Sequence, residues 1–517
     1  MIVDLFVVVA YFVLVLFFAL RGKSAKGMTS EEYFLSSRNL KWPSIAISTI
    51  ATNVQGYQFL GMMGSAYLYG LAQASLEINA AQGLWMAAFI FVPLYLKDKI
   101  VTITQFIKSK LGKTTSLVYS LANLALFSTI GLGAALFWGA YAAELVFSDY
   151  LSLISESRVI RVGTLVVFLG VFSAAYTYFG GLAAVVRTDI IQFSILLIGG
   201  ILVLLAAIHH LGGWGQLYVK TPDLMHLHLS ADHPKLPWIS VFGLFLLNIN
   251  YWCANQAIMQ RSLAARSLKD AQVGLLVGGV MKYFMAVIII VPGIALAGIL
   301  TDQPLADPDQ TFPYLVTNYL PVGVRGLILC ALFASLMSSV DSVFNSLSTL
   351  WTIDIYKGYL KKDASEEEMV STGRKTILVT LVTGVLVGWA LLYVKFENPE
   401  AAFTHTLNEF RYYVNCGIVV LICLAAFIMV KKQKWVLIAF FVTVPFQFLF
   451  QHLFPEMNYF VRAMWVILIG FLIGLLGNGI LNSWRKASTI IQYSNRDVKY
   501  WGYGLILSLI LLHIIFH

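Results

Sequence analysis

The stretch that decides the fold reads Ala51-Thr52-Asn53-Val54-Gln55-Gly56-Tyr57-Gln58. It lies inside an apolar segment, residues 42–70, that is long enough to cross a lipid bilayer. Five of its eight residues carry polar side chains, which is costly in hydrocarbon because every backbone N–H and C=O there needs a partner. Such residues are tolerated where a helix unwinds, and the carbonyls and dipole ends of two half-helices suit a cation and a polar solute. We therefore predict a transport site at a broken helix; alternatively, these groups only hydrogen-bond between packed helices.

The composition is that of a polytopic membrane protein. The chain has 517 residues, of which 59% are hydrophobic and 12% are charged. Its net charge of +9 does not indicate nucleic-acid binding, because most Lys and Arg residues lie in short loops between apolar segments. All four cysteines lie in apolar segments, which argues against a disulfide framework. The sequence contains no phosphate-binding loop and no catalytic triad, so neither ATP-driven transport nor enzyme activity is indicated.

The hydropathy pattern predicts an all-α protein with about fourteen membrane-spanning helices. The predicted spans are roughly residues 3–20, 42–70, 76–96, 115–147, 159–178, 183–208, 237–258, 272–300, 322–354, 373–394, 403–429, 435–452, 460–482 and 500–515. With this count most basic loop residues fall on one side, which the positive-inside rule assigns to the cytoplasm. We therefore expect a multi-pass protein of the cell membrane, surrounded by lipid, with a retained first helix and both termini outside.

A stripe of hydroxyl residues follows the segment 322–354. At 100° per residue its members share one side of a helix; they are Ser335, Ser338, Ser339, Ser342, Ser346 and Thr349. Hydroxyl oxygens are hard ligands that suit alkali cations, whereas a serine stripe alone permits close helix packing. Asp341, about 60° from Ser338, favours the cation interpretation. Asp189, at the inner end of segment 183–208, is either an interfacial charge beside Arg187 or a guide for a cation.

A second set of polar residues interrupts the segment 237–258, where an inverted repeat would place the partner of the first break. It consists of Asn248, Asn250, Tyr251, Trp252, Asn255 and Gln256. Glu77 and Lys282 are single charges in apolar segments, so a functional role is the default expectation. As an ion pair, each would reduce the desolvation cost of the other and keep hydrogen-bonding capacity for a sugar. The five histidines of loop 209–236 match no tight metal-ligand spacing and are expected to be solvated.

Four segments carry a resemblance to a known family. They are ATNVQGYQFLG (51–61), GGLAAVVRTD (180–189), YWCANQAIMQRSLAAR (251–266), and SSVDSVFNS (338–346) with TIDIY (352–356). Together they resemble the sodium/solute symporters, closest to the branch of sodium/glucose and sodium/galactose cotransporters, over roughly residues 28–430. The resemblance implies a leucine-transporter-type fold in one transmembrane domain, 1–517. Its expected parts are a leading helix (1–27), two five-helix inverted repeats (42–208 and 237–429) and three C-terminal helices (430–517).

The resemblance also implies roles for individual residues. The main sodium site would use carbonyls of Ala51, Val54 and Ser335 with hydroxyls of Ser338 and Ser339. A second sodium site or exit path would use Asp189, Ser338, Asp341 and Ser342. Substrate contacts would come from Asn53, Gln58, Glu77, Asn248, Lys282 and Asn408, with Tyr251 as the inner gate.

Departures from the family pattern leave the solute open. Asn408 stands in place of a glutamine, and Arg411, one helical turn further on, could receive a carboxylate. Arg187 replaces a usual tryptophan, and Asp341 replaces a small residue. We predict sodium-coupled import, by alternating access, of a monosaccharide or polyol such as glucose, galactose or myo-inositol. The alternatives are an acidic solute such as sialic acid, and a transporter-like solute sensor.

Overall fold

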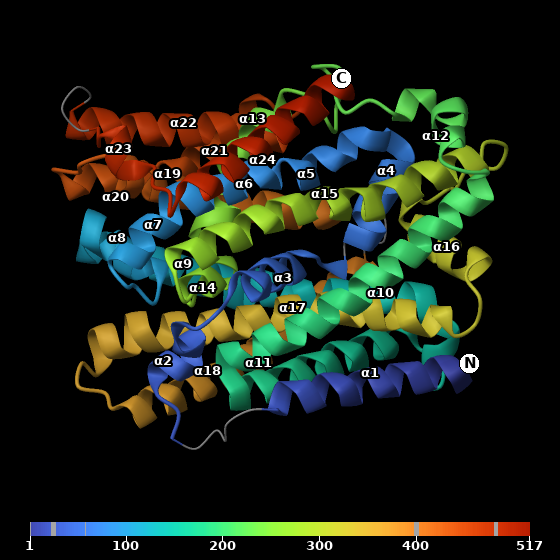
Figure 1. Ribbon diagram of the computed structural model, residues 1–517, viewed down its shortest axis with the longest axis horizontal. Coiled ribbons are helices and arrows are strands. Elements are labelled where there is room, and N and C mark those ends of the chain that lie inside the picture. Colours follow the sequence, from blue (N-terminus) through green and yellow to red (C-terminus); the bar gives the residue numbers. More distant parts are fainter. Residues whose placement is uncertain (1, 22–26, 57, 398–402, 480–483) are drawn as a thin grey trace.

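The computed structural model describes residues 2–21, 27–56, 58–397, 403–479 and 484–517, with only the backbone described at 403–409, 487 and 488. This part of the chain is helical, as predicted, and contains three isolated β-bridges but no strand. The long helices lie side by side, with α1 (Ile2–Leu20) at one edge and α22 (Tyr459–Asn478) and α24 (Arg496–Ile515) at the opposite edge (Figure 1).

The remaining α-helices vary widely in length. They are α2 (Ser30–Leu35), α3 (Trp42–Asn53), α4 (Met63–Tyr69), α5 (Ser75–Ile78), α6 (Ala80–Met86), α7 (Val92–Lys97), α8 (Ile103–Leu111), α9 (Lys113–Leu126), α10 (Leu132–Leu151), α11 (Arg158–Leu211), α12 (Gly215–Lys220), α13 (Ser240–Ile249), α14 (Gln256–Leu263), α15 (Leu268–Ile299), α16 (Thr311–Tyr319), α17 (Val324–Thr349), α18 (Glu366–Glu397), α19 (Phe403–Phe427), α20 (Gln433–Phe441), α21 (Thr443–Leu453) and α23 (Ala487–Ile490). Segments of π-helix are η2 (Gln58–Met62), η4 (Ala87–Phe91), η5 (Phe127–Gly131), η7 (Asn250–Ala254) and η9 (Leu350–Leu360). Segments of 3₁₀-helix are η1 (Ser36–Arg38), η3 (Gly70–Ala74), η6 (Pro222–Leu224) and η8 (Pro308–Gln310).

By length and apolar composition, the described helices provide 11 candidate membrane spans, fewer than the fourteen predicted. One reason is that two predicted spans can share one continuous helix. The 54 residues of α11 would extend about 81 Å if straight, far more than the ~30 Å of a hydrocarbon core. Gly181 breaks this helix with φ +53° and ψ −149°, and a Cβ there would lie 2.3 Å from the carbonyl oxygen of Tyr33. A side chain other than hydrogen therefore cannot be accommodated at this bend.

The predicted break at 51–58 is present. Helix α3 ends at Asn53, and its last helical hydrogen bond joins Val54 N to Ile50 O at 3.1 Å. Val54 is extended, with φ −77° and ψ +117°, and a helix resumes at Gln58. The carbonyl groups after Ile50 therefore leave the helical ladder and become available to other partners.

The predicted second interruption is also present. Helix α13 passes into η7, and the chain then becomes extended at Asn255, with φ −81° and ψ +115°. The Asn255 side chain accepts a hydrogen bond from Ala257 N at 2.9 Å, which starts helix α14. Two interrupted helices therefore supply polar backbone and side-chain groups to the interior.

Helix α17 lies at the centre of the bundle. It packs against α1, α3, α10, α11 and α18, and almost all of its side chains are buried. Asp4 of α1 fixes its beginning, because one carboxylate oxygen accepts from the backbone N–H groups of Gly323 and Gly326, both at 2.8 Å. The hydroxyl stripe predicted for this segment is therefore held in the protein interior, away from lipid.

Candidate functional site

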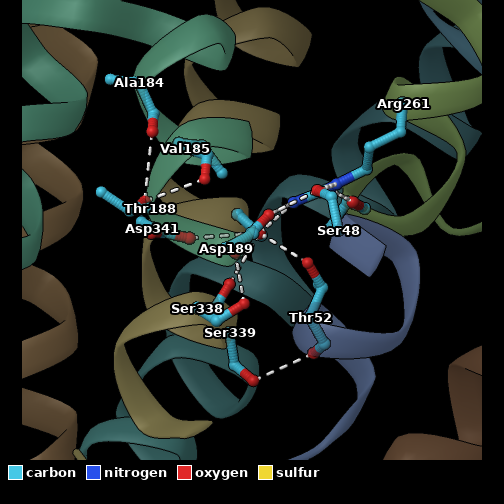
Figure 2. A network of polar contacts seen from close by, with 12 residues as sticks. Ser48, Thr52, Ala184, Val185, Thr188, Asp189, Arg261, Ser338, Ser339 and Asp341 are labelled. Carbon is cyan, nitrogen blue, oxygen red and sulfur yellow. Dashed lines mark hydrogen bonds and ion pairs between the residues drawn. The ribbon is translucent and has the colours of Figure 1, made fainter. Parts of the chain in front are cut away.

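The end of helix α3 contacts the hydroxyl stripe of α17 directly. The Ser339 hydroxyl donates to the carbonyl oxygen of Thr52 at 3.0 Å (Figure 2). It also lies 3.2 Å from the carbonyl oxygen of Ser335. Thr52 lies between Ala51 and Val54, whose carbonyls the sequence assigned to the main sodium site. The Ser335 hydroxyl is buried and has no hydrogen-bond partner in the described part of the chain. Hard oxygen atoms of two helices therefore meet where one of the helices unwinds.

Asp189 is fully buried at the centre of this region (Figure 2). Its two carboxylate oxygens accept hydrogen bonds from the hydroxyls of Ser338 and Ser48. Because Asp189 is buried, it is not an ordinary interfacial charge, which was one of the two roles that the sequence left open. The carboxylate joins α11 to both α3 and α17.

Arg261 is a member of this cluster that the sequence interpretation missed. Its position just after the predicted span 237–258 indicated a loop, but it lies in α14 and is 1% exposed. Its guanidinium group lies 3.4 Å from Asp189 Oδ2, donates to Ser48 Oγ at 2.8 Å and also contacts Ser342 Oγ. A side-chain cation therefore neutralises the carboxylate that the family resemblance assigned to a second sodium site or exit path.

Asp341 lies beside the serine stripe and contacts Tyr176 of α11. One of its oxygens accepts from the Tyr176 hydroxyl at 2.6 Å, and the other accepts from Ser342 Oγ at 3.2 Å. The Ser342 hydroxyl also lies 2.7 Å from the carbonyl oxygen of Ser338. The four residues assigned to the second site therefore form one connected network, with Tyr176 as an additional member.

The residues assigned to substrate binding surround one cavity of about 210 Å³. Its polar lining consists of Asn53, Gln58, Glu77, Asn248, Asn250, Tyr251, Trp252, Lys282, Arg411, Tyr412, Asn415 and Tyr459. This volume is below the 300–1,000 Å³ of typical drug-sized pockets and suits a small solute. Of the predicted contacts only Asn408 is not placed, because its side chain lies outside the described residues.

Glu77 and Lys282 form the predicted ion pair in the wall of this cavity, with exposures of 3% and 1%. The ammonium group also donates to Asn53 Oδ1 at 2.6 Å. The second carboxylate oxygen of Glu77 accepts from Gln58 Nε2 at 2.7 Å. Both charges are therefore paired and hydrogen-bonded, which offsets much of their desolvation cost.

Tyr251 closes one side of the cavity. Its hydroxyl accepts a hydrogen bond from Asn53 Nδ2 at 3.0 Å, and its ring lies 5.0 Å from that of Trp252. The Lys282 ammonium lies 5.8 Å from the Trp252 ring centre, so this aromatic face contributes to the electrostatics of the ion pair. Trp252 was singled out only as part of a polar cluster and not as a site residue.

Arg411 of α19 lines the same cavity, as its position one turn beyond Asn408 suggested. Its guanidinium also lies 3.5 Å from the carbonyl oxygen of Ile130. A positive charge is thus present within the lining of this cavity.

The histidines of loop 209–236 are not grouped as metal ligands. Among the described residues, no set of three or more His, Cys, Asp or Glu side chains could hold a metal ion. Instead, His228 pairs with His513 of the last helix, with 2.9 Å between their ring nitrogens. The four cysteines are free and buried.

Two interrupted helices, an ion-paired polar cavity and a buried cluster of hard oxygen atoms define a class: a secondary transporter that couples a small solute to a cation. The sodium:solute symporter family model matches residues 33–441, which is most of the chain. The chain belongs to the sodium:solute symporter family and is a sodium-coupled solute symporter rather than an enzyme.

Curated relatives share this assignment. The chain is 28% identical to a sodium/glucose cotransporter of Vibrio parahaemolyticus, over 96% of this chain and 94% of the relative. It is 32% identical to sodium/glucose cotransporter 4 of Mus musculus, over 74% of this chain and 59% of that longer protein.

Solved structures confirm the likeness in fold. A substrate-bound, outward-open Na⁺-coupled sialic acid symporter superposes with a TM-score of 0.78 at 18% identity, covering 93% of this chain and 98% of that one. A nucleobase-cation-symport-1 family transporter in a closed conformation gives a TM-score of 0.52 at 12% identity, covering 92% and 99%.

Proposed function

We propose that this protein imports a monosaccharide or a polyol together with sodium. The observation that carries this proposal is the cavity in which Glu77, Lys282, Asn53 and Gln58 form one hydrogen-bonded group. Both acceptors and donors line a small volume, which suits the hydroxyl groups of a sugar ring. The relatives named as sodium/glucose cotransporters support this choice of solute.

Sodium binds, in this proposal, between the broken helix α3 and the stripe of α17. Its ligands are the carbonyls of Ala51, Val54 and Ser335 with the hydroxyls of Ser338 and Ser339. The Ser339–Thr52 contact supports this, because it places a stripe hydroxyl against an unwound carbonyl of the same segment. Fourteen spans, two inverted five-helix repeats and both termini outside remain part of the proposal.

Transport then follows alternating access. Sodium stabilises the outward-open state, solute enters the cavity, the outer side closes, Tyr251 moves and sodium leaves past Asp189. One charge moving through 100 mV contributes about 2.3 kcal/mol, and a tenfold sodium gradient adds about 1.4 kcal/mol. One sodium ion could therefore sustain a solute gradient of roughly 500-fold.

The number of sodium ions depends on Arg261. Its guanidinium contacts both Asp189 and Ser342, two of the four residues assigned to the second site. A sodium ion and a guanidinium cannot share these oxygens without strong repulsion. We propose that Arg261 must withdraw from Asp189 before sodium passes, so the second site is an exit path in the arrangement described.

An acidic solute is the second candidate, and Arg411 is the observation that favours it. A guanidinium in the lining of the cavity could hold a carboxylate in a bidentate pair. In the sugar proposal the same residue packs against the backbone near Ile130.

The experiment is uptake into proteoliposomes with an imposed sodium gradient, comparing neutral hexoses and polyols with sugar acids. Uptake of a neutral solute that is lost when potassium replaces sodium supports the proposal. Uptake of only an acid overturns it in favour of the Arg411 candidate. Solute binding without counterflow of labelled solute would instead indicate a sensor.

A further inference from the structure

A second group of buried oxygen atoms lies where α8 and α9 pack against η9. Asp354 of η9 is 12 residues beyond Ser342 on the same continuous helix, a separation of roughly 18 Å. The carboxylate is 7% exposed, and its Oδ1 accepts a hydrogen bond from Thr102 Oγ1 at 2.6 Å. Its other oxygen, Oδ2, has no hydrogen-bond partner within the described residues. A buried carboxylate oxygen without a partner is costly, so it points to a bound ligand.

Two hydroxyl groups lie near the Asp354 carboxylate. Thr104 and Ser120 lie beside the Asp354 carboxylate, with exposures of 5% and 0%. Neither hydroxyl oxygen makes a hydrogen bond of standard length and angle in the described part of the chain, although both lie close enough to the Asp354 carboxylate to interact with it. All three residues line one cavity of about 50 Å³, which has room for a single ion or water. Three buried oxygen atoms from three helical elements thus converge on one small space.

Capping of helix α8 does not explain the position of Asp354. Thr102 occupies the N-cap position, but its hydroxyl bonds to Asp354 and makes no cap hydrogen bond. Instead, the backbone N–H of Val101 donates to Gln105 Oε1 at 2.7 Å, and that of Ile103 donates to Gln256 Oε1 at 3.0 Å. A glutamine side chain therefore satisfies the first donor of this helix, Ile103 N, and another satisfies the N–H before the cap, so the carboxylate is left for another partner.

Lys108 is the cationic side chain among the residues that line this cavity. It is exposed, and no ion pair within 4 Å joins it to Asp354 among the described residues, although its charge acts on that carboxylate. A site with one carboxylate and neutral hydroxyls suits a hard monovalent cation, whereas Ca²⁺ commonly takes 6–8 oxygen ligands.

We propose that Asp354, Thr104 and Ser120 bind a sodium ion, separately from the site between α3 and α17. This inference rests on the sodium coupling of the family and not on the proposed sugar. Such a site holds a sodium ion beside η9, beyond the residues Ser338, Ser339 and Ser342 of the stripe, where the neighbouring loops are rich in lysine.

The test is equilibrium binding of ²²Na⁺ to the purified full-length protein in detergent, with no solute present. We expect D354N to raise the half-saturating sodium concentration of one binding component about tenfold, which corresponds to about 1.4 kcal/mol. The nearly isosteric double variant T104V/S120A should act in the same direction. There are two matched controls. D363N changes an exposed aspartate between η9 and α18, and S109A changes an exposed serine of α8; both variants should bind sodium as the wild type does.

Each outcome decides the proposal. Removing the repulsive charge with K108M should leave sodium binding equal or tighter. If instead K108M destabilises the protein while D354N binds sodium normally, Lys108 is the counter-ion and the proposal is wrong. The proposal is also wrong if T104V/S120A binds normally when D354N fails to fold, or if D354N changes only the pH dependence of binding. Because no solute is present, failure of the sugar proposal would leave these results unaffected.

Discussion

Removing one member of the Glu77–Lys282 pair should separate solute binding from folding. The Glu77 carboxylate is 3% exposed, and in Lys282→Met it keeps the hydrogen bond from Gln58 but loses its cation. Breaking a buried pair by removing one partner typically costs 3–5 kcal/mol, so we expect a marked loss of thermal stability. Glu77→Gln with Lys282→Met removes both charges and should recover most of this stability.

Solute affinity should not recover in that double variant. A hydrogen bond to a charged group contributes about 1.5–3 kcal/mol, so its loss should weaken binding roughly ten- to 150-fold. The assay is sodium-driven uptake against solute concentration, with thermal unfolding measured on the same preparations.

Gln272→Leu is the matched control for a buried polar loss outside the cavity. Gln272 donates to the carbonyl oxygens of Ala88 at 3.0 Å and Gln492 at 2.8 Å. This variant should lose stability while keeping solute affinity. Wild-type affinity in Glu77→Gln or Lys282→Met would refute the assignment of the cavity as the solute site.

Three further changes test separate parts of the molecule. Ser339→Ala removes one hard ligand and should raise the sodium concentration for half-maximal uptake about two- to tenfold, and unchanged sodium dependence would contradict the main site. Arg411→Gln should impair only an acidic solute, so equal loss for a neutral sugar would assign the arginine to packing. Burial, and then the nearby His517, lower the pKa of His228 below its usual 6.5. The contact between His228 and His513 should therefore be fully stable above that pH and loosen as the pH falls. Hydrogen exchange of loop 225–237 should show weaker acid loosening in His228→Gln, in which only His513 of the pair still titrates.

The broken helices were predictable because polar residues in an apolar segment carry a physical cost. Asn53 and Asn255 both lie where the helix stops, as their positions suggested. The number of continuous helices was not predictable in the same way. Hydropathy does not distinguish a loop from a bent helix, and Gly181 joins two apolar runs through a single positive φ angle.

The meeting of Glu77 and Lys282 in one cavity was predictable, because isolated charges inside a membrane protein are costly unless they are paired. The place of Arg261 was not. Arg261 follows a polar stretch and precedes a loop, so its position in the sequence predicted a place at the cytoplasmic surface. Its partner Asp189 lies 72 residues earlier in the chain, and only the packing of α14 against α3 and α17 brings the two together.

The proposed sodium site between α3 and α17 and the proposed solute cavity share one feature that explains how they can be coupled. Thr52 offers its carbonyl to Ser339 on the sodium side, while the next residue, Asn53, binds Lys282 and Tyr251 on the solute side. Both residues belong to the last turn of α3, so a shift of that turn must alter both sets of contacts. Coupling between binding sites is reciprocal: sodium that fixes this turn favours solute, and solute favours sodium to the same degree. The break in α3 therefore both frees backbone groups for binding and links the two ligands through adjacent residues.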